Sequence, residues 1–263
     1  MGFKCGIVGL PNVGKSTLFN ALTASKNAEA ANFPFCTIDP NIGIVDVIDE
    51  RLDKLTKLSN SKKKIYTNIT FVDIAGLVKG ASKGEGLGNK FLSHIREVDA
   101  IIHLVRCFDS DKITHVNSKI NPVEDLETIK TEIILSDLDI VQKKLEKGKK
   151  KLLQEKEVKI LEEKLRQLNE GKEVTIEDEN EKKFLTTLGL LTIKPKIIVC
   201  NVDEESLMKG NAFTESIKKK YSNEKIITIC ADIEDQIMGL DKNERETFMK
   251  EIGLNKTGLN QLI

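Results

Sequence analysis

A short apolar run, Phe3 to Val8, leads directly into the segment GLPNVGKST at residues 9–17. This segment fits the pattern G-x-x-x-x-G-K-[ST], in which two glycines let the backbone curl so that its N–H groups converge on phosphate. The apolar run predicts a strand. The residues from Thr17 to Leu22 predict a helix whose positive N-terminus faces the anion. The chain is therefore predicted to fold around a P-loop that binds a nucleoside triphosphate.

The pattern also assigns roles within the loop. Lys15 is expected to reach the β- and γ-phosphates, and Ser16 is expected to give its hydroxyl to Mg²⁺. The remaining loop residues surround the phosphates with backbone donors. The predicted nucleotide-binding residues of this segment are Asn12, Val13, Gly14, Lys15, Ser16 and Thr17.

Composition limits the classes of partner. Of 263 residues, 41 are Lys or Arg and 41 are Asp or Glu, so no overall charge recruits nucleic acid or membrane, and such a contact requires a local patch. The five cysteines form no C-x-x-C pair and read as reduced thiols. No apolar stretch is long enough to span a bilayer, and the first strand begins too early for a signal peptide. We expect a cytoplasmic protein with no membrane partner and no sequence-specific DNA binding.

Apolar, β-branched runs recur along the chain with helical or loop segments between them. This rhythm predicts an α/β fold with a mostly parallel, helix-flanked sheet, whose ligands bind at the carboxyl ends of the strands. The Gly9 loop, Asp73, Asn201 and Cys230 all fall at such ends. The expected strands are Phe3 to Val8, Ile42 to Val47, Ile65 to Val72, Ala100 to Cys107, Lys196 to Cys200 and Lys225 to Ile229.

The pattern changes between residues 122 and 194, where strand-like runs vanish and charge density rises. Two series of apolar residues with helical spacing, one from Ile134 to Leu145 and one from Val158 to Leu168, predict an antiparallel helical hairpin, or coiled coil. We expect residues 122–194 to be an insertion in a nucleotide-binding domain formed by residues 1–121 and 195–263. Six lysines between Lys143 and Lys151 indicate either a solvated helix face or a contact with RNA or a partner.

Two segments are expected to sense the γ-phosphate. The sequence DIAG at residues 73–76 follows a predicted strand, so Asp73 would hold Mg²⁺ through water and Gly76 would offer its N–H to the γ-phosphate. Thr37 is the expected second protein ligand of Mg²⁺, although it also suits the start of a strand. The metal-binding residues are therefore predicted to be Ser16, Thr37 and Asp73.

Leu77 stands where Ras-like enzymes carry a glutamine that orients the attacking water, and leucine cannot form a hydrogen bond through its side chain. Another group must therefore position the water. The glycine-rich segment from 79 to 88 is one candidate, and the histidines are others. We expect His103 to be packed in the core, His94 to be partly exposed and His115 to lie in a solvated loop.

The sequence NVDE at residues 201–204 occupies the position of the guanine-reading pattern N-K-x-D. Glu204 replaces the aspartate, and its extra methylene moves the carboxylate by about 1.5 Å. This shift disrupts a bidentate contact whose two bonds are together worth roughly 3–6 kcal/mol. We therefore predict ATP over GTP, with the Asn201 amide oxygen or a carbonyl near Val202 accepting from adenine. Cys230 and Ala231 are expected to cover the base.

The motifs at residues 32–41, 73–88 and 201–204 together resemble those of the YchF, or Obg-like ATPase, family. The first two also fit other Obg-type GTPases, and Glu204 selects this branch. The resemblance implies a TRAFAC-class P-loop protein that hydrolyses ATP slowly. It matches His115 to a mobile-loop histidine implicated in hydrolysis, and Asn12 to an asparagine that related enzymes use around K⁺. By this resemblance Lys15, Gly76 and His115 act in hydrolysis, with Mg²⁺ and K⁺ as cofactors.

The resemblance further implies association with the ribosome, at its large subunit, and a link to translation control and stress responses. Members of the family continue into a TGS domain after a segment like residues 257–263. This chain has none and reads as a truncated nucleotide-binding part, so contacts that need the TGS domain are expected to weaken.

The leading interpretation is a Mg²⁺-dependent ATPase that binds ATP and ADP and acts as a molecular switch. An Obg-type GTPase is one alternative. The other is a ribosome or RNA adaptor that binds nucleotide without turnover and uses the lysines from Lys143 to Lys151 as its contact.

Overall fold

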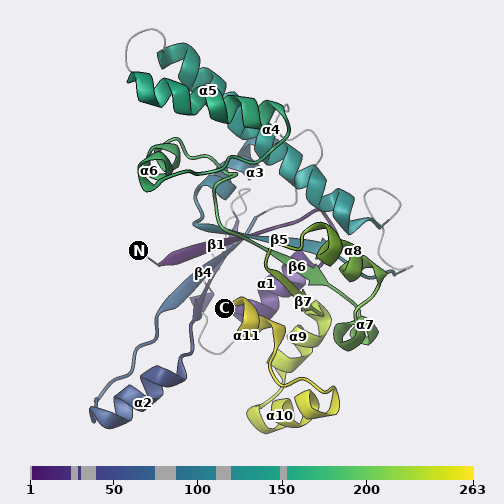
Figure 1. Ribbon diagram of the computed structural model, residues 1–263. Helices are drawn as coiled ribbons and strands as arrows, with labels where there is room; N and C mark the ends of the chain where they lie inside the picture. Colours follow the sequence, from purple (N-terminus) through teal and green to yellow (C-terminus); the bar gives the residue numbers. More distant parts are fainter. Residues whose placement is uncertain (1, 25–28, 31–39, 75–86, 111–119, 149–152) are drawn as a thin grey trace.

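The computed structural model describes residues 2–24, 29–30, 40–74, 87–110, 120–148 and 153–263, and its described strands form one seven-stranded sheet in the order β2-β3-β4-β1-β5-β6-β7 (Figure 1). The pairs β4/β1, β1/β5, β5/β6 and β6/β7 are parallel, which confirms the predicted mostly parallel sheet. The strands are β1 (Phe3–Val8), β2 (Glu29–Ala30), β3 (Asn41–Asp46), β4 (Asn68–Asp73), β5 (Ala100–Arg106), β6 (Lys196–Asn201) and β7 (Ile226–Ile229).

Helices cover both faces of the sheet (Figure 1). On one face α1 packs against α9, and α11 packs against β7 beside α9. On the other face α4 packs against β5 and α8, and Arg96 of α3 donates to Ser136 of α4 at 2.5 Å. The described helices are α1 (Lys15–Thr23), α2 (Glu50–Leu58), α3 (Leu87–Arg96), α4 (Pro122–Gly148), α5 (Glu155–Asn169), α6 (Glu179–Thr187), α7 (Glu204–Lys209), α8 (Ala212–Lys220), α9 (Ala231–Gly239), α10 (Lys242–Glu251) and α11 (Gly258–Leu262).

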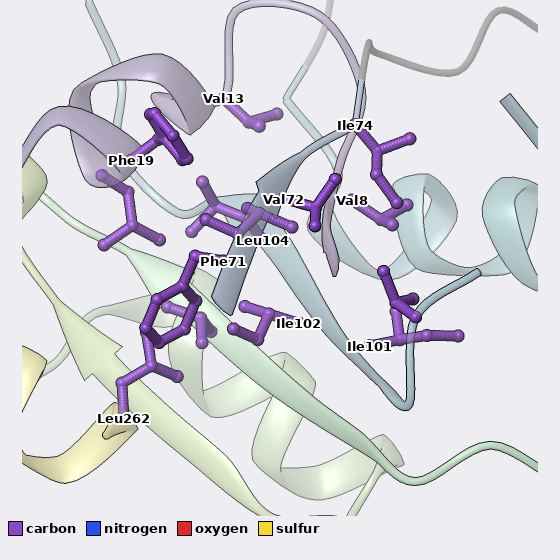
Figure 2. Packing of buried hydrophobic residues seen from close by; sticks show 14 of the residues in the cluster. Val8, Val13, Phe19, Phe71, Val72, Ile74, Ile101, Ile102, Leu104 and Leu262 are labelled. Atoms are coloured by element: carbon purple, nitrogen blue, oxygen red, sulfur yellow. The ribbon is translucent and has the colours of Figure 1, made fainter. Parts of the chain in front are cut away.

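The core lies between the sheet and these helices. Figure 2 shows Phe71 of β4 beside Leu262 of α11, close to the aliphatic side chains of β5. Phe71 is fully buried, and Ile101 and Ile102 of β5 are 2% exposed. A central parallel strand is covered on both faces, so its apolar residues run continuously instead of alternating with polar ones. This continuity is why the short apolar runs of the sequence predicted strands.

The sheet edge next to β4 differs from the prediction. β3 pairs antiparallel with β4, and β2, which was not predicted, pairs antiparallel with β3. The apolar run from Ile65 predicted an earlier start for β4, but that strand begins at Asn68 and Ile65 is 70% exposed. Ile65 belongs to the connection from α2, where an apolar side chain does not indicate burial.

The predicted helical hairpin is confirmed, since α4 and α5 pack against each other at one end of the molecule (Figure 1). Ile134, Val141 and Leu145 of α4 meet Leu161 and Leu168 of α5 in one buried cluster. The same insertion contains a third, shorter helix, α6, from Glu179 to Thr187.

Two buried polar contacts join the hairpin to the segments that follow it. Lys164 of α5 is fully buried and pairs with Glu181 of α6 at 2.7 Å. Asp137 of α4 accepts hydrogen bonds from the N–H groups of Leu191 and Thr192 at 2.8–2.9 Å, where the chain returns to the sheet. Burial raises the pKa of the Asp137 carboxyl against the lowering effect of these bonds. Among the described residues, no helix combines the length and apolarity needed to cross a bilayer.

Candidate nucleotide-binding site

The carboxyl ends of the parallel strands bring the predicted motifs to one edge of the sheet. β1 ends at Val8 before the P-loop, β4 ends at Asp73, β6 ends at Asn201 and β7 ends just before Cys230. Their parallel register places these residues side by side, as in the pairing of Asn201 with Ile229. The convergence expected from the sequence is therefore present.

The P-loop has the backbone geometry that its glycines permit. Gly14 has φ of 91°, and a Cβ there would lie 2.3 Å from Asn201 Nδ2. A Cβ on Gly9 would lie 2.7 Å from the carbonyl oxygen of Leu104. Asn12 also has positive φ, 64°, a conformation that asparagine tolerates better than most residues. Neither glycine position has room for a side chain, because both lie against neighbouring groups of the sheet edge.

Lys15 and Asp73 meet at the phosphate end of the site. Lys15 Nζ lies 2.5 Å from Asp73 Oδ1, and the two side chains are 12% and 6% exposed. A cavity of about 370 Å³ lies at this end of the site. It is lined by P-loop residues between Leu10 and Thr17, including Lys15 and Ser16. The side-chain cation and carboxylate predicted for phosphate and metal binding are thus brought together at one point.

The oxygen groups at this point suit Mg²⁺, which prefers few protein ligands of carboxylate or hydroxyl type together with phosphate oxygens and water. Ser16 supplies the hydroxyl and Asp73 the carboxylate. The described residues contain no cluster of three or more His, Cys, Asp or Glu side chains that would form an all-protein metal site. Thr37, the other predicted metal ligand, and Gly76, the predicted γ-phosphate donor, lie outside the described residues.

Asn201 joins the P-loop to the loop after β7. Its side-chain nitrogen donates to the carbonyl oxygen of Val13 at 3.0 Å, and its side-chain oxygen accepts from the N–H of Ala231 at 2.9 Å. Asn201 is 4% exposed. The sequence predicted the Asn201 oxygen as a possible acceptor for adenine. In the structure this oxygen already accepts a backbone hydrogen bond, which makes Asn201 a positioning residue for two loops of the site.

A cavity of about 550 Å³ lies where the sequence predicts the base to bind. Its lining includes the predicted residues Asn12, Gly14, Thr17, Asn201, Val202, Glu204 and Cys230. Val202 is 2% exposed, so it forms part of the buried wall. Ala231, the other residue predicted to cover the base, begins α9 beside this wall, with its N–H held by Asn201.

Asp203 and Glu204 both line the cavity at the start of α7, and Asp203 in addition caps the helix. Asp203 is the N-cap residue, and its carboxylate accepts the N–H of Ser206 at 2.8 Å. Glu204 is the first helical residue and lines the base cavity. N-capping satisfies a donor that the helix itself leaves unpaired, so one oxygen of the Asp203 carboxylate is engaged by the helix.

Sequence reasoning missed one wall of the cavity, formed by Phe108, Asp109 and Ser110 after β5. Arg106, which is 1% exposed, holds this segment by donating to the carbonyl oxygens of Phe108 at 3.1 Å and Ser110 at 3.4 Å. The signal that could have found them is their position directly after a predicted parallel strand. Asp232, Ile233 and Gln236 of α9 were missed as well.

The histidines follow the prediction where they are described. His103 is buried in β5, and burial, helped by the nearby charge of Lys196, lowers the pKa of His103 to about 3. His103 is therefore a neutral core residue at physiological pH. His94 on α3 is half-buried. His115, predicted to act in hydrolysis, lies outside the described residues.

The described cysteines are free thiols, as predicted. Cys107, Cys200 and Cys230 are buried, while Cys5 is half-buried. Burial, with a smaller contribution from Asp99, raises the pKa of Cys5 to about 11, so this thiol stays protonated at neutral pH.

A phosphate-binding loop between β1 and α1, a D-x-x-G strand end and a base cavity at the edge of a mostly parallel sheet define a P-loop nucleotide hydrolase of the GTPase class. Comparison with known proteins gives the same class. Residues 4–201 match the family described as "50S ribosome-binding GTPase".

Individual relatives resolve the family further. The chain is 49% identical to the "Ribosome-binding ATPase YchF" of Bacillus subtilis, covering 100% of this chain and 75% of the relative. It is 48% identical to the protein of that name in Escherichia coli O157:H7, with 74% of the relative covered. The solved YchF GTPase of Schizosaccharomyces pombe superposes with a TM-score of 0.83 at 35% identity, over 99% of this chain and 74% of that one. The chain belongs to the YchF family.

Proposed function

We propose that this protein is a Mg²⁺-dependent ATPase that hydrolyses ATP slowly in preference to GTP and acts as a molecular switch on the ribosome. The observation that carries the base preference is the division of roles between Asp203 and Glu204. The names of the relatives do not decide it, because the bacterial ones are called ATPases and the S. pombe structure a GTPase.

Guanine recognition of the N-K-x-D type needs a carboxylate at the position of Glu204 that accepts two hydrogen bonds from the base. The longer side chain of Glu204 places its carboxylate about 1.5 Å beyond the position that an aspartate carboxylate would take. To replace it, Asp203 would have to offer both carboxylate oxygens to guanine, and one of them, Oδ1, already accepts the N–H of Ser206 at 2.8 Å. Both routes to a bidentate guanine contact are therefore weakened. Adenine would bind through backbone groups near Val202 and through apolar contact with the buried wall.

The phosphate end supports hydrolysis by positioning. Lys15 would bind the β- and γ-phosphates, and Ser16 and Asp73 would hold Mg²⁺, which would supply charge neutralisation at the phosphates. Lys15 and Asp73 now pair with each other, so binding of the triphosphate and metal would exchange that ion pair for contacts with the ligand. Thr37 and Gly76 complete the site in this proposal and release their loops after hydrolysis.

Slow turnover follows from the apolar Leu77 at the position where Ras-like enzymes orient water. His115 is proposed to assist the attacking water. In the sequence, its segment comes directly after Asp109 and Ser110, which line the cavity. Asn12, with its positive φ, lines both cavities of the site. We propose K⁺ beside it as a second cofactor. Equal hydrolysis rates in Na⁺ and K⁺ would contradict this proposal.

The ribosome enters this proposal through the bacterial relatives, which carry "ribosome-binding" in their names. We propose that the protein works in the cytoplasm, at the large subunit, in translation control and stress responses. Residues 1–121 and 195–263 would form the nucleotide-binding domain, and residues 122–194 the inserted coiled coil. The alternative function is an RNA adaptor that binds nucleotide without turnover and contacts RNA through the lysines from Lys143 to Lys151. This alternative predicts no phosphate release.

The test is phosphate release from ATP and from GTP with Mg²⁺ present, for the unaltered chain and for Glu204→Asp. The matched control is Glu205→Asp, which makes the same change one residue further along α7, outside the cavity. We expect ATP to be preferred, Glu204→Asp to move the preference toward GTP and Glu205→Asp to leave it unchanged. A GTP preference in the unaltered chain would instead establish an Obg-type GTPase.

A further inference from the structure

The segment around α2 projects from the sheet on the extended connection between β3 and β4, on the side away from the α4–α5 hairpin (Figure 1). We call residues 49–66 the α2 tip. α2 has no buried residue along its whole length. A helix gains most of its stability by burying an apolar face, so a helix without a buried residue, at the end of the connection from β3 to β4, suggests a surface that serves contact with a partner.

The α2 tip is basic although the whole chain is neutral. It carries six Lys or Arg residues against three Asp or Glu, whereas the complete sequence has 41 of each kind. Two of its cations are paired internally, Arg51 with Asp49 at 2.6 Å and Lys64 with Asp53 at 2.5 Å. In the described part of the chain, the remaining four have no carboxylate within ion-pair distance. They are Lys54, Lys57, Lys62 and Lys63.

The loop after α2 adds hydrogen-bond donors to this charge. Residues 59–64, with the sequence SNSKKK, are all exposed, and Asn60 turns the chain with φ of 47°. Hydroxyl, amide and ammonium groups are the donors with which proteins contact phosphate and sugar oxygens of nucleic acids. Leu58 and Ile65, 81% and 70% exposed, flank this loop and present apolar surface beside the donors.

We propose that the α2 tip binds the sugar–phosphate backbone of RNA, with Lys54, Lys57, Lys62 and Lys63 as the phosphate contacts. Charge complementarity identifies the partner, because four unpaired ammonium groups and a donor-rich loop lie within one short segment of a neutral molecule. A membrane surface is a poorer match, since α2 begins with the acidic residues Glu50 and Asp53. The proposal deepens the proposed association with the ribosome and rests on it.

The experiment compares two triple variants that remove the same charge. Lys54→Gln, Lys62→Gln and Lys63→Gln together alter the tip. The control, Lys183→Gln with Lys219→Gln and Lys250→Gln, alters three exposed lysines on α6, α8 and α10. Binding to purified ribosomes is measured by co-sedimentation over a series of KCl concentrations, and ATP binding and thermal unfolding confirm that both variants are folded.

We expect the tip variant to bind ribosomes at least about tenfold more weakly, and the slope of log affinity against log salt to fall by about two, since each phosphate contact contributes about 0.7. The control variant should keep the affinity and slope of the unaltered chain. Equal losses in both variants, or no loss in the tip variant, would overturn the proposal.

A photocrosslinker at Leu58 identifies the partner directly. With Leu58→p-benzoylphenylalanine, a crosslink to ribosomal RNA supports the proposal, while a crosslink only to a ribosomal protein overturns it. If the unaltered chain does not bind ribosomes at all, the proposed ribosome association fails. The tip is then tested with isolated ribosomal RNA, where binding that is lost in the tip variant supports the proposal and absence of binding overturns it.

Discussion

The nucleotide-binding edge and the α4–α5 hairpin are held together by different kinds of contact. At the edge, residues far apart in the sequence are joined by hydrogen bonds, as where Asn201 connects Val13 with Ala231. In the hairpin, adjacent helices share an apolar seam around Leu161, closed by one buried ion pair. The comparison teaches that the hairpin contributes to stability without forming part of the nucleotide site, whereas the contacts at the edge serve both stability and binding. Substitutions of buried residues at the edge should weaken nucleotide binding and also lower stability, while substitutions in the hairpin should lower stability alone.

The largest effect is expected at Lys15. Lys15→Met keeps the length of the side chain but removes two charge-assisted contacts to phosphate, together worth about 3–6 kcal/mol. It also leaves Asp73, 7% exposed, without its cation, so a lower unfolding temperature should accompany the loss of binding. Calorimetric titration with ATP measures the first effect and thermal unfolding the second. An ATP affinity close to that of the unaltered chain would contradict the site.

A substitution in the hairpin should lower stability without changing ATP binding. Glu181→Gln leaves the fully buried Lys164 without its main partner, which should cost about 3–5 kcal/mol of unfolding free energy. Glu179→Gln, an exposed residue of the same helix, is the matched control and should change little. Denaturant unfolding measures both. ATP affinity should stay constant, and a parallel loss of affinity in Glu181→Gln would break the proposed separation.

Asn201→Ala should affect both properties, because this residue is buried and joins two loops of the site. The carbonyl of Val13 and the N–H of Ala231 lose their partner, at about 1–3 kcal/mol for each backbone group. Denaturant unfolding and ATP titration measure the two consequences, with the exposed Asn243→Ala as control. Full ATP affinity in Asn201→Ala would show that the two loops keep their positions without the side chain.

A smaller effect is expected from His103 on acidification. Its pKa is about 3 in the folded chain, below the value of about 6.5 in unfolded chains, so only the unfolded state takes up a proton between these values. Stability therefore falls as pH drops, by about 2 kcal/mol between pH 7 and pH 5. His103→Leu should flatten this part of the stability profile measured by denaturant unfolding. An unchanged pH slope would assign the acid sensitivity to other groups.

Sequence predicted the parts of the molecule in which a local pattern is tied to one geometry. The P-loop glycines, the apolar runs of β1 and β5 and the helical spacing around Leu161 all have such patterns, and the structure contains each element. A local pattern could not show that the side-chain amide of Asn201 forms hydrogen bonds with the backbone of Val13 and of Ala231, because these residues are distant in the sequence. Nor could it show that Phe108 reaches the cavity, which depends on how Arg106 folds the chain after β5.

The connection between β3 and β4 shows that sequence can also predict burial where the structure has none. Ile65 has the apolar character of a strand residue but lies in an exposed connection. Apolar composition predicts burial only where a neighbouring element covers the residue, and no described helix covers the α2 tip (Figure 1).

The central claim is that Glu204, with one carboxylate oxygen of Asp203 engaged in capping α7, turns the proposed base site from guanine toward adenine. The most direct test is calorimetric binding of ATP, ADP, GTP and GDP to the unaltered chain with Mg²⁺ and K⁺ present. The account predicts that ATP binds at least about tenfold more tightly than GTP, a difference of about 1.4 kcal/mol, with ADP preferred over GDP in the same direction. Tighter binding of GTP would contradict it.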